Sequence, residues 1–139
     1  MTAARQLNLF KSRRQKGEQP PLALELKTHI ALADLLRVGL AAGWLCNHFP
    51  AGEARAKVTA GRLKRMGLRP GWADFIFIGP TGVHHWLELK RGGANLNPWQ
   101  MDFHKAMKAR GVPCEVARSY EEAVTILRAW GALRTGVTT

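Results

Sequence analysis

The chain has 139 residues, 46% of them hydrophobic, which suits one folded domain and excludes both two full domains and a disordered protein. No apolar run reaches the roughly 20 residues of a membrane span, and none follows the basic N-terminus as in a secretory signal. Lys and Arg number 21 against 10 Asp and Glu, and the net charge of +11 indicates a polyanionic partner, usually nucleic acid.

The chain divides into a basic arm, one domain and a tail. Residues 1–21 are polar and basic, so we expect a flexible arm that can lie along phosphates. Residues 22–131 carry the patterns of regular structure and form the domain, and 132–139 are expected to be a frayed tail. Cys46 and Cys114 lack metal-type spacing and are interpreted as reduced core residues of a cytoplasmic protein.

Eight elements follow in the order helix, strand, helix, strand, strand, helix, strand, helix. Hydrophobic patterns, glycines, prolines and capping residues predict their bounds as 22–38, 44–49, 53–66, 73–78, 83–90, 98–110, 113–117 and 120–130. Asn97 and Ser119 are the predicted N-caps of the last two helices. This order predicts an α/β fold with a mixed sheet of about four strands flanked by helices.

The two strands of residues 73–90 form a predicted hairpin that carries the candidate chemistry. Side chains alternate along a strand, so Glu88 and Lys90 share one face while Leu87 and Leu89 point into the core. Asp74 lies about as far before the turn as Glu88 lies after it, so the two carboxylates should meet. The alternative is a surface salt bridge on a solvated strand.

Two converging carboxylates are suited to Mg²⁺, which prefers oxygen ligands and keeps open positions for water and phosphate. The main-chain carbonyl of Leu89, between Glu88 and Lys90, could supply a further oxygen. Lys90 could hold the attacking water or the phosphate. The pattern is therefore typical of metal-assisted phosphodiester hydrolysis.

The context of these residues resembles the VRR-NUC family of the PD-(D/E)XK nuclease superfamily, from about Phe49 to Leu127. The resemblance rests on the segments GRLKRMGLRPG, WAD, WLELK and SYEEA, and on a helix glutamine at Gln100. It implies a restriction-endonuclease-like core and a DNA endonuclease that uses Mg²⁺ or Mn²⁺. The ligands would be Asp74 and Glu88, with Lys90 as the catalytic lysine. The family usually has proline where this chain has Ala73.

Two further site residues have competing interpretations. The family expects a glutamate on the first helix, and Glu25 is the best match, either as a metal ligand, directly or through water, or as a solvated carboxylate. Gln100 stands three residues after Asn97, so it can belong to a capping box, to the active site, or to both.

Histidines and tryptophans near the motif are expected to have mainly structural roles. His84 shares the face of Glu88 and His85 the opposite face, and we assign neither a ligand role. For Trp72, Trp86 and Trp99 core packing is expected, although one of them could stack on a base.

The predicted DNA-binding residues are basic and lie on the second helix and after the catalytic strand. They are Arg55, Lys57, Arg62, Lys64, Arg65 and Arg91. The alternative for the helix is a solvated face. The resemblance implies a structure-selective endonuclease of a bacterium or a phage-infected cell, acting on branched DNA as a homodimer. The competing hypotheses are a non-catalytic DNA-binding module on the same fold and a basic subunit that binds protein or RNA.

Overall fold

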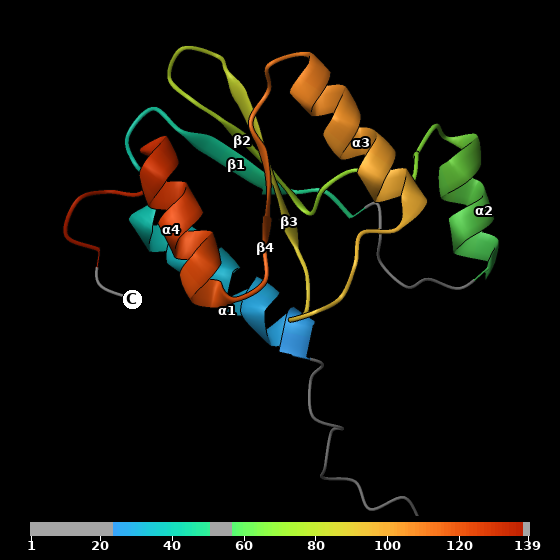
Figure 1. Ribbon diagram of the computed structural model, residues 1–139, viewed down its shortest axis with the longest axis horizontal. Coiled ribbons are helices and arrows are strands. Elements are labelled where there is room, and N and C mark those ends of the chain that lie inside the picture. The colour runs from blue at the N-terminus through green and yellow to red at the C-terminus, as the bar shows by residue number, and fades with distance from the viewer. Residues whose placement is uncertain (1–23, 51–56, 138–139) are drawn as a thin grey trace, which may run out of the picture.

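A computed structural model describes residues 24–50 and 57–137, which form one sheet with helices on both of its faces (Figure 1). The helices are α1 (Leu24–Gly39), α2 (Lys57–Arg65), α3 (Pro98–Ala109) and α4 (Tyr120–Trp130), and the strands are β1 (Leu45–His48), β2 (Phe75–Ile78), β3 (His84–Leu89) and β4 (Cys114–Ala117). The predicted α/β class and element order are confirmed. The predicted arm 1–21 and Arg55 lie outside the described residues.

The sheet is mixed and has the strand order β1-β2-β3-β4. β1 pairs with β2 and β2 with β3 in antiparallel fashion, which confirms the predicted hairpin. β3 and β4 are parallel, so the chain must cross over between them, and α3 forms this crossover. The C-terminal ends of β3 and β4 therefore lie at the same edge of the sheet, where the candidate site is found.

The two faces of the sheet have separate cores. Phe75, Phe77, Leu87 and Leu89 point toward α1 and α4, and each of them is at most 3% exposed. On the other face, Trp86 packs against Phe103 of α3. Burial of each large apolar side chain contributes roughly 1.5–3 kcal/mol to folding. β3 is therefore covered on both faces, and its polar residue Glu88 is enclosed by the same layers. Lys90 directly follows the strand.

The segment after α4 corrects the expectation of a frayed tail. Ala132 is fully buried and Leu133 is 7% exposed. The N–H of Ala41 donates to the carbonyl of Ala132 at 2.8 Å, and that of Arg134 to the carbonyl of Gly39 at 2.8 Å. Residues 132–137 thus form a short extension that closes the core beside the end of α1. Segments near a chain end are commonly poorly ordered, but the burial of Ala132 and Leu133 holds this one in place.

α2 differs from the other helices because none of its side chains is buried. It lies beside α3, at the margin of the molecule (Figure 1). At nine residues it is shorter than the roughly 12–15 residues at which an isolated helix becomes marginally stable in water. Because no side chain of α2 is buried, its basic side chains are not needed for packing and can contact a partner. Within the described residues, no helix is long and apolar enough to span a membrane.

The two cysteines are too far apart to be joined. Cys46 lies in β1 and Cys114 in β4, the two outer strands of the sheet. Neighbouring strands are spaced by about 4.8 Å, so three spacings give roughly 14 Å, against a limit of about 7 Å between the Cα atoms of a disulfide. Burial, followed by the charges of Glu88 and Glu115, raises the pKa of the Cys114 thiol to about 12, which keeps it protonated and unreactive.

Candidate active site

The hairpin register brings Asp74 and Glu88 together. Phe75 is paired with Leu87, so the next position along the ladder places Asp74 opposite Glu88. Asp74 also closes this end of the hairpin, because its Oδ2 accepts a hydrogen bond from the N–H of Leu89 at 2.7 Å. The main chain of β3 therefore orients one candidate ligand beside the other, as the count of residues on either side of the turn predicts.

Glu88 is the most enclosed charged residue of the site, at 3% exposure. Its Oε1 accepts a hydrogen bond from Nε2 of Gln100 at 2.7 Å and lies 3.7 Å from Nζ of Lys90. Its Oε2 is buried and has no hydrogen-bond partner among the described residues. A buried carboxylate oxygen left without a partner is energetically unfavourable, so this atom is suited to a ligand that the protein itself does not supply.

Gln100 both caps α3 and contacts Glu88. Its backbone N–H donates to Oδ1 of Asn97 at 2.9 Å, and its Oε1 accepts from the N–H of Asn97 at 2.9 Å, which completes a capping box. Because the cap engages Oε1, the amide nitrogen of the same side chain is turned toward Glu88. The same side chain therefore caps α3 and contacts Glu88, and the start of α3 is fixed directly to the candidate site.

Both carboxylates are less acidic than usual. Burial, and then the charge of Asp74, raise the pKa of Glu88 to about 8. Burial is also the main cause that raises the pKa of Asp74, with the charge of Glu25 acting in the same direction. Two carboxylates that are held close together and away from water are costly to ionise, and a cation between them would relieve that cost.

Glu25 faces this site without joining its centre. It lies in the first turn of α1 and lines a pocket of about 280 Å³ together with Leu89, Lys90, Arg91 and Arg118. Its charge acts on both Asp74 and Glu88. In the part of the chain that the structure describes, however, no three His, Cys, Asp or Glu side chains lie close enough together to form a metal cluster. Arg91, one of the predicted DNA-binding residues, lies in the loop directly after Lys90.

The histidines fall into two groups. His48 ends β1 beside the site: its Nδ1 lies 2.9 Å from the carbonyl oxygen of Asp74, and its ring packs edge-on against that of His29. His85 packs between Trp44 and Trp130 on the face of the sheet that α4 covers, while His84 is exposed. The structural interpretation of His84 and His85 thus agrees with their positions, and His48 is the histidine close to the carboxylates.

Two contacts that position the site could not be predicted from the sequence. Nη1 of Arg118 donates to the carbonyl of Gly92, at 2.8 Å, and to that of Ala94, and thereby fixes the loop that follows Lys90. Gly71 lies against the backbone of Trp99, and a Cβ added to Gly71 would be 2.4 Å from the Trp99 carbonyl oxygen. Both contacts join distant segments, so only the folded arrangement shows them.

The tryptophans and basic residues are only partly as predicted. Trp86 is buried and confirms the expectation of core packing, and Trp72, although 37% exposed, packs against Trp86 and Phe103. Trp99 is 61% exposed and departs from the expectation. The reason is that α3 covers Trp86 while the start of α3 itself faces solvent. The described basic residues of α2, all exposed, are Lys57, Arg62, Lys64 and Arg65. They lie on the outlying helix and are not gathered around Asp74 and Glu88.

Comparison with known proteins supports the fold. No family model and no curated protein sequence matches the chain. A solved structure described as a "VRR_NUC domain" is similar, with 19% sequence identity and a TM-score of 0.55. The similarity covers 78% of this chain and 99% of that one. The resemblance predicted from the sequence is therefore confirmed in three dimensions: the chain has the restriction-endonuclease-like α/β fold of a VRR_NUC domain.

Proposed function

We propose that this chain is a divalent-metal-dependent DNA endonuclease that hydrolyses phosphodiester bonds. The observation that carries the proposal is the environment of Glu88. Its Oε2 is buried and has no hydrogen-bond partner in the described part of the chain, in a site that also holds Asp74, Lys90 and Gln100. A purely structural salt bridge would be expected to satisfy both oxygens of a carboxylate this deeply buried.

The residues of the site suit a hard divalent cation such as Mg²⁺, or Mn²⁺ in its place. Asp74 and Glu88 would hold it, with the carbonyl of Leu89 as a further oxygen and Glu25 acting through water. Mg²⁺ is commonly bound by one or two carboxylates together with water and phosphate, so it does not require a three-residue ligand cluster, and the described residues form none. When bound, such an ion lowers the pKa of a water and neutralises charge on the phosphate.

The side chains around the carboxylates have distinct tasks in this proposal. Lys90 is 3.7 Å from Glu88 and only 15% exposed, so its ammonium is held where it can orient the attacking water or bind the scissile phosphate. Gln100 orients Glu88 through its amide. Arg91, exposed and adjacent in the chain, would contact a neighbouring phosphate of the DNA.

We further propose that the substrate is branched DNA and that the protein acts as a homodimer. The net charge of +11 supports a nucleic-acid substrate. One chain of this size contributes one catalytic centre, and a symmetric dimer would present two centres to the strands of a junction.

The test is incubation of the purified protein with labelled linear duplex, nicked, flap and four-way-junction DNA in Mg²⁺, Mn²⁺ or EDTA. We expect cleavage with either metal, no cleavage in EDTA, and faster cleavage of the branched substrates. Equal rates on all substrates would refute structure selectivity alone. DNA binding without cleavage in any metal would instead identify a non-catalytic DNA-binding module.

A further inference from the structure

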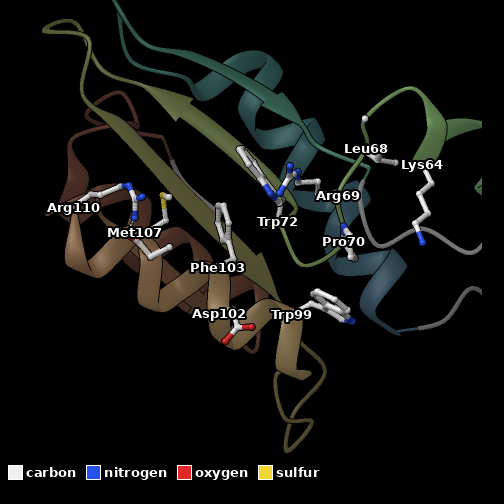
Figure 2. A pocket seen from close by; sticks show the side chains of 12 residues that line it. Lys64, Leu68, Arg69, Pro70, Trp72, Trp99, Asp102, Phe103, Met107 and Arg110 are labelled. Atoms are coloured by element: carbon white, nitrogen blue, oxygen red, sulfur yellow. Dashed lines mark hydrogen bonds between the residues drawn. The ribbon is translucent and has the colours of Figure 1, made fainter.

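A second and larger cavity lies between α3 and the loop that joins α2 to β2. It has a volume of about 900 Å³ and is open to solvent (Figure 2). The residues that matter here are three aromatic and three basic ones: Trp72, Trp99, Phe103, Lys64, Arg69 and Arg110. They belong to segments that are separate in sequence, so the fold itself assembles this cavity.

Trp99 is the aromatic side chain that remains available in this cavity. It is 61% exposed, and within the described ranges its ring makes no aromatic contact. Trp72 is different: it stacks on Phe49 at a centroid distance of 5.4 Å and packs against Phe103 at 5.0 Å. Trp72 and Phe103 therefore form a rigid apolar wall, and Trp99 at the start of α3 offers a free ring face beside it.

The charge of the cavity rim favours an anionic ligand. Lys64, Arg69 and Arg110 line it, and Asp102 is the one carboxylate among the lining residues. An apolar wall surrounded by cations is complementary to a nucleotide, which presents an apolar base face next to a phosphate. A protein partner that inserted only apolar side chains would leave these three cations without counter-charges.

The cavity is fixed relative to the catalytic carboxylates. Trp72 precedes Asp74 by two residues, and Trp99 precedes Gln100, whose amide contacts Glu88. Gly71, with φ +87°, packs against the backbone of Trp99 so closely that any side chain there would collide with it. The loop and the first turn of α3 are thus held together, and whatever binds in the cavity has a defined position relative to the site of cleavage.

We propose that this cavity binds an unpaired nucleotide of the DNA substrate, with its base stacked on Trp99 and its phosphate near Arg69. The inference rests on the proposed function in taking DNA as the ligand, and it names the feature that would distinguish branched DNA from duplex. In a duplex both faces of a base are already stacked on neighbouring bases. Only a base freed at a junction, flap or end can stack on Trp99.

The test is fluorescence anisotropy in EDTA with three labelled DNAs: a single strand, a blunt duplex and a duplex with a single-stranded arm. Trp99→Ala should weaken binding of the two DNAs with unpaired bases by roughly 5- to 100-fold and leave the duplex within about twofold, because stacking on an aromatic ring has this strength. Trp99→Phe should restore most of the affinity. Trp99→Ala retains the Cβ beside Gly71, so we expect it to fold, and circular dichroism checks this.

Matched controls use residues of α3 outside the cavity. Met101→Ala removes an apolar side chain that is 53% exposed, and Lys105→Gln removes an exposed cation. Both should bind all three DNAs almost as the wild type does. Arg69→Gln, within the cavity, should weaken binding of the armed duplex more than Lys105→Gln does.

Some outcomes would overturn the inference. Equal loss on duplex and single strand, no loss with Trp99→Ala, or equal effects of Trp99→Ala and Met101→Ala would each exclude stacking in this cavity. If Trp99→Ala abolished self-association in sedimentation without changing DNA binding, the cavity would be a protein-docking surface instead. The binding assay does not depend on cleavage. If Trp99→Ala weakened only the binding of DNA with unpaired bases, and the protein cleaved no DNA, the proposed nuclease function would be refuted while this inference would remain supported.

Discussion

Replacing Glu88 by Gln should change how the stability of the metal-free protein depends on pH. Burial, followed by the charge of Asp74, raises the pKa of Glu88 from 4.5 to about 8 in the folded state. Since the folded-state pKa lies above that of the unfolded chain, the stabilising contribution of protonated Glu88 is complete below pH 4.5 and is lost as pH rises through about 8. A difference of one in pKa corresponds to about 1.4 kcal/mol, so the loss is on the order of 3–5 kcal/mol.

The assay is urea unfolding in EDTA at about pH 5, 7 and 9, for wild type and Glu88→Gln. The free energy of unfolding of the wild type should fall across this range relative to that of the variant, because the glutamine amide does not titrate. Asp74→Asn removes one charge that raises the pKa of Glu88, so the loss in this variant should be smaller and should be complete at a lower pH than in the wild type. Parallel pH dependences for wild type and Glu88→Gln would show that Glu88 ionises normally and that the buried-carboxylate argument is wrong.

Three further predictions concern the supports of the site. Gln100→Glu keeps a capping-box acceptor but places a second carboxylate against Glu88. The helix content should therefore persist while the cleavage rate falls at least tenfold. Cleavage at the wild-type rate would contradict the proposed role of the Gln100 amide. Gly71→Ala should lower the melting temperature and the cleavage rate more than Gly67→Ala does. Gly67 has a similarly positive φ, but a Cβ added there would have no neighbour within 4 Å. Equal losses in the two variants would show that the contact between Gly71 and Trp99 does not stabilise the site. Neutralising Arg62, Lys64 and Arg65 together should flatten the salt dependence of DNA affinity, by about 0.9 in slope for each phosphate that α2 no longer binds, and an unchanged slope would remove α2 from the interface.

The parts of the site that the sequence predicts are those governed by local rules. Alternation along a strand and the length of a hairpin fix which side chains lie opposite each other, and these rules place Asp74 beside Glu88. The capping box of α3 is equally local, since Asn97 and Gln100 are three residues apart. The positions of Asp74, Glu88 and Gln100 therefore follow from the sequence of one hairpin and of the first turn of α3.

The parts that could not be predicted depend on how distant segments pack. Whether a tryptophan is buried depends on what covers it: α3 covers Trp86 and leaves Trp99 exposed. Ala132 and Leu133 are buried because the end of α1 lies beside them, which their position near the C-terminus does not indicate. The hydrogen bond from Arg118 to the carbonyl of Gly92 joins residues that are 26 positions apart in the sequence. Short-range patterns carry no information about any of these contacts.

The central claim is that Asp74 and Glu88 form the metal-dependent catalytic centre. Its most direct test is one side-by-side measurement of cleavage of a labelled four-way junction in Mg²⁺ by wild type, Asp74→Asn and Glu88→Gln, with DNA affinity measured for each in EDTA. We predict that both variants bind the junction nearly as tightly as the wild type and lose cleavage by about three orders of magnitude or more, roughly the effect of removing charge stabilisation from a transition state. Mg²⁺-dependent cleavage at the wild-type rate by either variant would contradict the account.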